Sequence, residues 1–339
     1  MRPLLTIDGE TIGRNARAWA AFTGSPVRAV VKCEGYGWGY EPLVRALDDQ
    51  VAGYCVADFE ELTALRRHTS LPVVLLGAIE PDRLAAALDL AALPTISTAR
   101  ELEIAREWQQ KTGKRLRLRV GVRPAAGWSG LNLGELEGLA PKLAASGAEV
   151  EVWTHVTDPS QDREQRARLG DGVALLERAG VRVVSSDSAS TYSAAAGAID
   201  GSFARIGVGL FGAGAAEVAG VACALRVAAP IVRIERGGAG TRVGYGRTFL
   251  ARDEEIVVAR CGYGDGLPKT LAGADDILSV GMQYVTARSS RCDKNRTQVV
   301  LIDGKSNLDA FAAKAHRLTH EIVTAFGNAA RANDVSIEG

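Results

Sequence analysis

The sequence carries no excess of charge. Its 339 residues include 40 lysines and arginines and 40 aspartates and glutamates, so the formal net charge at pH 7 is zero. Proteins that bind nucleic acids or membrane surfaces usually present a basic face, and this balance removes that signature. We therefore expect no nucleic acid and no membrane as a partner, and a small molecule as the ligand.

Cysteine is scarce, and long apolar runs are missing. The cysteines at positions 33, 55, 223, 261 and 292 are odd in number and widely spaced, which fits neither a disulfide framework nor paired zinc ligands. The sequence does not open with a basic stretch followed by an apolar run, and nowhere do about 18 apolar residues follow one another. It thus predicts a cytoplasmic protein without a metal site.

The remaining composition is that of a folded protein. Hydrophobic residues make up 47% of the chain and charged residues 24%, a balance that excludes disorder over most of the length. The chain is longer than one typical domain, so we expect a second, smaller unit beside the first.

The first two-thirds of the chain alternate short β-branched runs with stretches of helical period, as repeated βα units around a parallel sheet do. Eight such units fit a (β/α)8 TIM barrel, and a doubly wound open sheet is the alternative. The predicted strands cover residues 27–33, 53–57, 73–77, 93–97, 116–122, 150–156, 181–186 and 203–208, with helices such as 58–67 and 98–110 after them.

After Gly212 the pattern changes to strands separated by Gly and Asp, which indicates a C-terminal β-rich domain. The glycine-rich stretch 212–220 is the candidate linker, so we place the two domains at residues 1–220 and 221–339. We expect strands at 225–235, 241–246, 255–260, 277–287 and 298–302, and a helical segment at 307–333.

Lys32 is the first candidate for chemistry. It lies at the C-terminal edge of the first predicted barrel strand, where barrel enzymes place their catalytic groups. A lysine after Val30 and Val31 either extends to water or serves as a partly buried amine. Tyr36, Gly37 and Gly39 follow in a loop suited to surround a ligand.

The block Lys32-x-x-x-Tyr36-Gly37-x-Gly39 resembles the pyridoxal-phosphate lysine motif of the alanine racemase family, a group of fold-type III enzymes. Further blocks resemble that family in its order over nearly the whole chain, which favours the barrel over the open sheet. They are Thr154-His155, Asp187-Ser188-Ala189 and the segments 205–212, 243–246 and 262–266.

The resemblance implies a pyridoxal 5'-phosphate-dependent amino-acid racemase. It implies that Lys32 binds the cofactor as an imine and then acts as an acid/base on one face of the substrate α-carbon. It assigns the opposite face to Tyr263, delivered by the partner subunit of a homodimer with shared active sites. His155 and Arg205 match the polar relay that adjusts this tyrosine, and Arg205 would also face the pyridine nitrogen and keep it unprotonated.

The same resemblance assigns the cofactor phosphate to Tyr36, Ser188 and the backbone amides of Gly207 and Val208. From the residues alone, His155 would be a core histidine and Tyr263 a packed aromatic residue, and Ser188 would be a helix N-cap, a role that is compatible with phosphate binding.

Several positions depart from the family pattern. Trp128 stands where the family has an arginine that orients the substrate carboxylate, and the lysine that holds that arginine is missing too; Arg117, Arg119 and Arg123 are candidate substitutes at a different spacing. His320 replaces a phosphate-binding tyrosine, and Cys292-Asp293 alters the small-substrate pocket. We therefore expect Trp128, Cys292 and Asp293 to contact a substrate that is not necessarily alanine.

Two other functions stay open at this point. One is another fold-type III reaction, the decarboxylation or epimerisation of a modified amino acid, which Trp128 and the Cys292-Asp293 pair motivate. The other is a pyridoxal-phosphate-binding protein without racemase turnover, which the second domain argues against, because carriers of the cofactor lack it.

Overall fold

The computed structural model describes residues 2–125, 127, 129–156, 160, 162–189, 202–214, 217–244 and 248–332; for residues 162, 188 and 189 it describes the backbone only. The chain divides into two units. Residues 16–33 and 47–207 form the barrel unit, and residues 1–15, 34–46 and 208–339 form the β-rich unit. The domain boundary at residue 220 stays a prediction.

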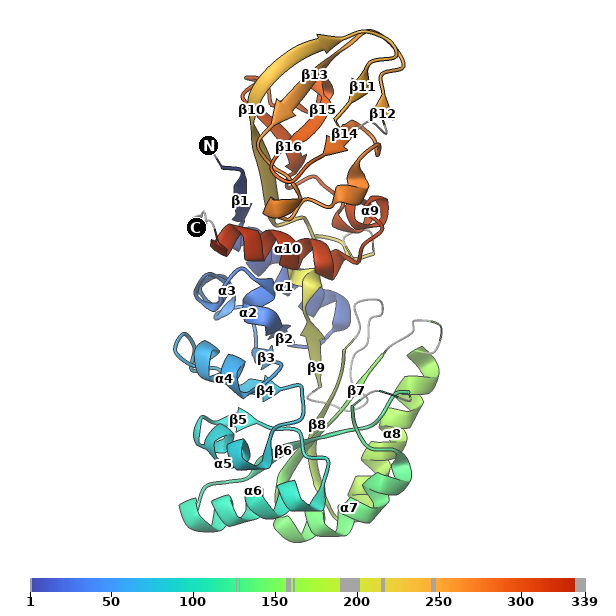
Figure 1. Ribbon diagram of the computed structural model, residues 1–339. Helices are drawn as coiled ribbons and strands as arrows, with labels where there is room; N and C mark the ends of the chain where they lie inside the picture. The colour runs from blue at the N-terminus through green and yellow to red at the C-terminus, as the bar shows by residue number, and fades with distance from the viewer. Residues whose placement is uncertain are drawn as a thin grey trace. The chain divides into compact units, whose positions relative to one another are not determined.

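The barrel unit contains eight parallel strands in the order β5-β4-β3-β2-β9-β8-β7-β6 (Figure 1). A parallel bridge between Thr95, just after β5, and Arg119 on β6 joins the two ends of this order, so the barrel is nearly closed. The structure confirms the (β/α)8 prediction. The strands are β2 (Val27–Val30), β3 (Gly53–Val56), β4 (Val73–Leu75), β5 (Ala92–Leu93), β6 (Arg117–Gly121), β7 (Glu149–His155), β8 (Arg182–Ala189) and β9 (Phe203–Ile206).

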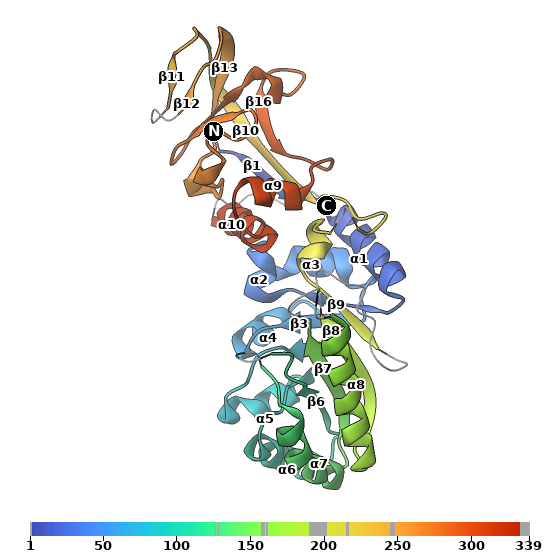
Figure 2. The ribbon, with the colours of Figure 1, turned by 90° about the vertical axis from the view of Figure 1, so that its right-hand side faces the viewer.

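Helices follow these strands and cover the outside of the barrel; α8, for example, lies against β7 and β8 (Figure 2). Their starts follow from side chains that accept hydrogen bonds from the first turn. Thr98 and Asn132 each form a capping box with the glutamate three residues later, and Asp58 caps α4. The helices are α4 (Phe59–Leu65), α5 (Pro81–Asp89), α6 (Ala99–Thr112), α7 (Leu133–Ser146) and α8 (Asp162–Arg178).

One barrel strand is much shorter than its pattern predicts. The segment 93–97 forms only the end of β5, because Pro94 has no N–H to give to the ladder. Pairing resumes after the proline, where Ile96 N donates to Arg119 O at 2.7 Å.

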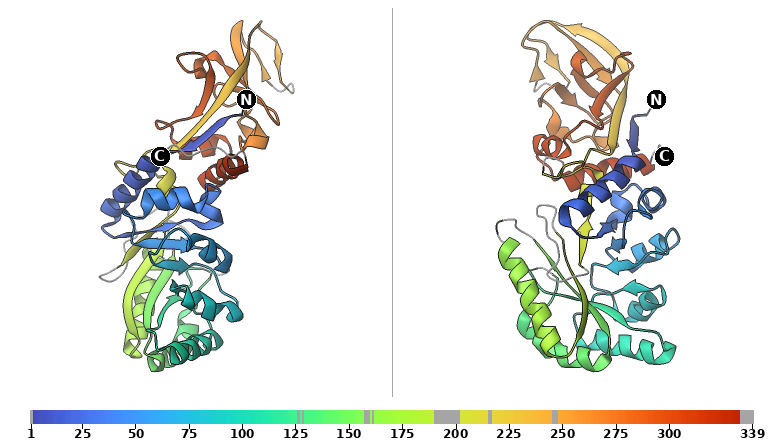
Figure 3. Two further views of the ribbon diagram at one scale, coloured as in Figure 1. Left: turned by 90° about the vertical axis from the view of Figure 1, so that its left-hand side faces the viewer. Right: turned by 180° about the vertical axis from the view of Figure 1, so that it is seen from behind.

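The β-rich unit contains an antiparallel sheet in the order β1-β10-β13-β15-β14, with β16 also paired to β10. Strand β1, which the sequence reading missed, runs alongside β10 (Figure 3). The strands are β1 (Leu4–Ile7), β10 (Leu225–Gly237), β13 (Glu254–Ala259), β14 (Ile277–Val280), β15 (Val285–Arg288) and β16 (Gln298–Ile302), and β11 (Arg242–Val243) pairs with β12 (Thr248–Phe249).

Two C-terminal predictions were too long. The segment 277–287 is a hairpin of β14 and β15 rather than one strand. The segment 307–333 contains two helices, α9 (Leu308–Lys314) and α10 (Thr319–Ala332), and the break includes His316 at φ 50°. None of the helices in the described ranges is long and apolar enough to cross a membrane. The other helices are α1 (Gly9–Thr23), α2 (Lys32–Tyr36) and α3 (Tyr40–Leu47), with the short 3-10 turns η2 (Val208–Phe211), η3 (Tyr263–Asp265), η4 (Lys269–Leu271) and η5 (Ser289–Arg291).

Candidate active site

Four neighbouring barrel strands end at predicted site residues. Strands β2, β9, β8 and β7 lie side by side in the sheet. Lys32 comes soon after β2, Gly207 follows β9, Ser188 is the last residue but one of β8, and His155 is the last residue of β7. Because the carboxyl ends of parallel strands meet at one end of a barrel, these residues belong to the same end.

The turn that begins at Lys32 is left-handed. Cys33, Glu34, Gly35 and Tyr36 have φ values of 54°, 52°, 66° and 56°. A residue with a side chain pays about 1–2 kcal/mol for this conformation, because Cβ approaches the following carbonyl oxygen. Such a turn persists only where its surroundings hold it, and strained backbone of this kind clusters at functional sites.

Glu61 holds the start of the turn. Cys33 N donates to Glu61 Oε1 at 2.5 Å, and Ala57 N donates to Glu61 Oε2 at 2.8 Å. Burial raises the pKa of the Glu61 carboxyl, against the opposing effect of these N–H groups and of the Lys32 ammonium. A carboxylate thus lies within electrostatic range of Lys32. The sequence reading missed Glu61, and its only signal is its place three residues after the N-cap Asp58.

Helix α10 holds the end of the turn within the β-rich unit. Trp38 Nε1 donates to Val323 O at 3.2 Å. Gly327 lies so close that a Cβ there would come within 2.3 Å of Tyr36 O and 2.8 Å of Trp38 Cδ1. The backbone of the turn therefore packs directly on the helix, and Gly327 is required by this approach.

Three aromatic rings meet beside this turn. The ring of Tyr36 lies 5.5 Å from that of Phe211 and 6.1 Å from that of His320, centroid to centroid. Phe211 belongs to η2, which begins at Val208. Three of the predicted phosphate contacts, Tyr36, Val208 and His320, therefore lie on elements that meet in this unit. The Ser188 side chain lies outside the described residues.

Arg205 is fixed inside the barrel. Its Nε lies 2.8 Å from Asp187 Oδ1, and its Nη2 donates to Thr154 O at 2.5 Å. Burial lowers the pKa of the Arg205 guanidinium, and the Asp187 carboxylate opposes this effect. Two of its three nitrogens are engaged, so its orientation is set by β7 and β8.

Two of the candidate substitutes for the family arginine are engaged elsewhere. Arg119 is fully buried and forms an ion pair with Asp187. Arg123 donates through Nε to Gly130 O at 3.0 Å and pairs with Glu135 at 3.2 Å. Trp128 itself lies outside the described residues, as does Tyr245 of the segment 243–246.

Tyr263 lies at the surface of the β-rich unit. Its side chain is 42% exposed, and its backbone N donates to Gly281 O at 2.9 Å. Asp265 fixes the turn, since its Oδ2 accepts from Gly262 N at 2.9 Å and from Arg260 Nη1 at 2.7 Å. The tyrosine is thus held on a rigid turn with its side chain accessible.

The Cys292-Asp293 pair also belongs to this unit. Burial raises the pKa of the half-buried Cys292 thiol. Asp293 accepts hydrogen bonds from Gln298 N at 3.0 Å and from Thr297 N at 2.6 Å and Oγ1 at 2.8 Å. Both Asp293 oxygens are therefore used within its own turn, and a substrate contact for either residue stays a prediction.

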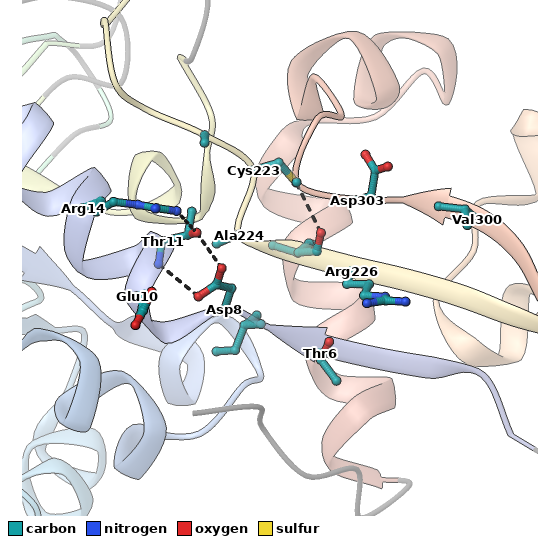
Figure 4. A pocket seen from close by; sticks show the side chains of 14 residues that line it. Thr6, Asp8, Glu10, Thr11, Arg14, Cys223, Ala224, Arg226, Val300 and Asp303 are labelled. Carbon is teal, nitrogen blue, oxygen red and sulfur yellow. Dashed lines mark hydrogen bonds between the residues drawn. The ribbon is translucent and has the colours of Figure 1, made fainter. Parts of the chain in front are cut away.

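A polar pocket elsewhere in the β-rich unit contains none of the predicted site residues. It has a volume of about 790 Å³ and lies where β1 leads into α1, beside the start of β10 (Figure 4). Its polar side chains bond one another: Thr11 Oγ1 donates to Asp8 Oδ2 at 2.7 Å, and Arg14 Nη2 donates to Thr11 Oγ1 at 2.6 Å. Among the described residues, no group of three His, Cys, Asp or Glu side chains is placed to hold a metal ion.

Each unit, taken by itself, carries groups of the kind that bind pyridoxal phosphate. The barrel unit supplies an amine at a strand end and an oriented guanidinium, and the β-rich unit supplies a phenol and an imidazole that lie together. An amine can form the covalent bond to the cofactor, and the neutral donors suit its phosphate.

Comparison with known proteins decides the family. The model of the alanine racemase N-terminal domain matches residues 7–215, and that of the C-terminal domain matches residues 224–333. The chain belongs to the alanine racemase family. This membership confirms the resemblance found in the sequence, and with it a pyridoxal-phosphate-dependent racemase that acts on an amino acid.

Individual alanine racemases are similar to this chain over most of its length. The protein of Streptococcus uberis is 26% identical over 347 residues, 94% of each chain, and that of Streptococcus pyogenes serotype M6 is 27% identical over 301 residues, 82% of each. The crystal structure of alanine racemase from Bartonella henselae with covalently bound pyridoxal phosphate superimposes with a TM-score of 0.80 at 20% identity, covering 96% of this chain and 98% of that one. This likeness confirms the fold.

Proposed function

We propose that this racemase interconverts the two enantiomers of an amino acid that is not necessarily alanine, with Lys32 and Tyr263 as acid/base groups on opposite faces of the α-carbon. The observation that carries the proposal is the position of Lys32, at the carboxyl end of β2 and at the start of a left-handed turn that Glu61 holds. The strained backbone of this turn persists only because neighbouring groups hold it, as expected at a functional site.

Each predicted residue has a role toward the cofactor. Lys32 would bind it covalently, and Tyr36, Ser188, His320 and the amides of Gly207 and Val208 would bind its phosphate. Arg205, fixed by Asp187 and Thr154, would donate to the pyridine nitrogen and leave it without a proton. When bound, pyridoxal phosphate supplies the electron sink without which no side chain removes an α-proton efficiently.

Proton transfer needs two groups that the chain supplies from different units. Lys32 Nζ would hold or release the proton on one face, and the Tyr263 phenol on the other, with His155 and Arg205 as the relay. The exposed side chain of Tyr263 supports its delivery into the site of a partner subunit. We therefore propose a homodimer with shared active sites, in the cytoplasm as the cysteine pattern indicates.

The residues around the substrate make an amino acid other than alanine a candidate. Trp128 provides no cation for the substrate carboxylate, and among the described candidates Arg119 is committed to Asp187. An indole can instead pack against a larger side chain. Relatives named alanine racemase make alanine the reference substrate.

The test uses purified protein loaded with pyridoxal phosphate and a panel of L-amino acids, analysed by chiral chromatography with carbon dioxide detection. We expect the D-enantiomer of at least one amino acid and no carbon dioxide. Lys32→Ala should lose both turnover and the borohydride-reducible cofactor band, whereas the exposed Lys142→Ala on α7 should keep both. Carbon dioxide without D-product would replace racemisation by decarboxylation, and a reducible band in Lys32→Ala would place the cofactor bond elsewhere.

A further inference from the structure

Five charged side chains lie inside the barrel. The exposed fractions are 2% for Arg28, 0% for Arg119 and 5% for Arg205, against 2% for Glu151 and 1% for Asp187. Barrel interiors are filled mainly by branched apolar side chains. Each buried ion costs several kcal/mol unless others compensate it. The burial of five charged side chains in one place therefore calls for a structural or functional explanation.

Asp187 is the junction of this cluster. Its Oδ1 lies 2.8 Å from Arg205 Nε, and its Oδ2 pairs with Arg119 Nη2 and lies 3.6 Å from Arg28 Nη1. Glu151, in contrast, pairs mainly with Arg28, whose Nη1 and Nη2 donate to its carboxylate oxygens at 2.5 and 3.0 Å. Only Asp187 contacts Arg205 among these carboxylates.

An aromatic ring also packs against Arg205. The Trp153 ring lies 5.1 Å from Arg205 Cζ and 5.6 Å from Arg119 Cζ. A Cβ at Gly121 would come within 2.7 Å of this ring, so the glycine makes room for it. Nη2 of Arg205 donates to Thr154 O, and its Nε is held in an ion pair with the Asp187 carboxylate at 2.8 Å.

The cluster has a defined charge near neutral pH. Burial alone would raise the pKa of Asp187, but Arg119, Arg205 and Arg28 hold it below its usual range. Burial raises the pKa of the neighbouring Cys55 to about 11, so this thiol stays neutral. With three guanidiniums and two carboxylates the net buried charge is +1, and Asp187 is the group that compensates Arg205.

We propose that Asp187, backed by Arg119, is a positioning residue for Arg205, which it orients and whose charge it compensates toward the cofactor ring. The inference rests on the proposed place of Arg205 opposite the pyridine nitrogen. A compensated guanidinium acts as an oriented hydrogen-bond donor rather than as a bare cation, which spares the electron sink that the reaction needs. No motif in the sequence pairs Arg119 with Asp187.

The first variant for the test is Asp187→Asn in the loaded enzyme. Loss of the carboxylate leaves Arg205 uncompensated, and a stronger positive potential disfavours protons on the bound cofactor. We expect the pH midpoint of its visible absorbance change to move to lower pH by on the order of one unit. Glu149→Gln is the control, because Glu149 pairs with Arg115, Arg117 and Arg182 at the start of β7 and should leave the midpoint unchanged.

A second variant separates positioning from stability. Asp187→Asn raises the net buried charge to +2, which by itself destabilises the fold, whereas Asp187→Asn with Arg119→Gln restores +1. We expect this double variant to recover most of the lost Tm and to keep part of the midpoint shift, since the charge of Arg119 is gone but Arg205 still lacks its carboxylate. If the single variant does not fold, the midpoint is measured in this double variant instead.

A wild-type midpoint in either variant would overturn the proposal and reduce the cluster to a structural element. The proposed function is tested separately from this result. It requires cofactor binding and racemisation by the wild-type protein, and both are measured on the same preparation. A wild-type enzyme that binds and turns over, with variants unshifted, rejects only the role of Asp187.

Discussion

A single carboxylate holds the turn after Lys32, so Glu61→Gln tests it directly. In the wild-type protein, Cys33 N and Ala57 N each donate to a different oxygen of Glu61. Glutamine retains only one of these two acceptor oxygens, and it removes the negative charge near Lys32. A fully buried unsatisfied donor costs about 1–3 kcal/mol, and the cost is smaller here because the Ala57 bond is partly buried and the Cys33 bond is exposed. We expect faster amide exchange at Cys33 or Ala57 and cofactor binding weakened by about tenfold.

The neighbouring Glu60 provides the matched control. It is exposed on the same helix, α4, so Glu60→Gln makes the same change of charge without touching the turn. Equal effects of the two variants would show that Glu61 acts only through the general charge of the helix.

Trp128 supports a prediction about substrate preference. A charge-assisted hydrogen bond contributes about 1.5–3 kcal/mol, and an indole cannot supply one to a carboxylate. We expect wild-type kcat/KM to be higher for a bulkier or modified amino acid than for alanine, and Trp128→Arg to raise kcat/KM for alanine by about tenfold or more. Wild-type turnover of alanine that equals or exceeds that of every larger amino acid would contradict this expectation.

Helix α10 supports the turn that contains Tyr36, and Gly327 is its point of closest approach. Gly327→Ala places a Cβ against Tyr36 O and Trp38, which must separate the helix from the turn. Overpacking of this kind costs about 1–3 kcal/mol. We expect a lower Tm together with weaker cofactor binding, because Tyr36 and His320 are moved apart.

The comparison for this change is Gly170→Ala in α8. A Cβ at Gly170 meets nothing within 4 Å, so alanine there should stabilise the helix by up to about 1 kcal/mol. If Gly327→Ala were equally harmless, the close packing of α10 on the turn would not hold in solution.

If the active site is shared between subunits, the active enzyme is a dimer of two copies of this chain. Lys32 belongs to the barrel unit and Tyr263 to the β-rich unit. We expect inactive Lys32→Ala and Tyr263→Phe chains to recover up to about a quarter of wild-type activity when mixed, because random pairing gives half the dimers one site with both residues. Size-exclusion chromatography and confirmed subunit exchange accompany the assay; exchange without recovery would reject the shared site.

Acid stability provides a second property of the whole molecule. The folded pKa of Asp187 is held below the ordinary value of 3.8. Its ion pairs therefore stabilise the fold above about pH 4 and lose this contribution as the pH falls through the lower folded pKa. We expect the free energy of unfolding, measured in urea, to decrease less between about pH 5 and 3 in the variant with Asp187→Asn and Arg119→Gln. An identical pH dependence would show that other carboxylates control acid unfolding.

The sequence predicted the strands of the barrel because apolar runs between helical stretches identify buried parallel strands. It misjudged 93–97, where Pro94 interrupts the ladder, and 277–287, where one apolar pattern continues through a hairpin. Strand β1 was missed because its four residues are recognisable only through their partner β10, more than 200 residues away.

The sequence by itself determined the family, the expected cofactor and the order of the motif residues, because these lie in contiguous blocks whose spacing is fixed by the chain; that Lys32 binds the cofactor stays a prediction. Only the tertiary structure decided that Glu61 holds the turn of Lys32, that His320 lies beside Tyr36, and that Arg119 and Asp187 surround Arg205. These contacts join residues from separate strands and helices. Their charges stabilise one another only when the barrel closes and excludes water, which no local pattern encodes.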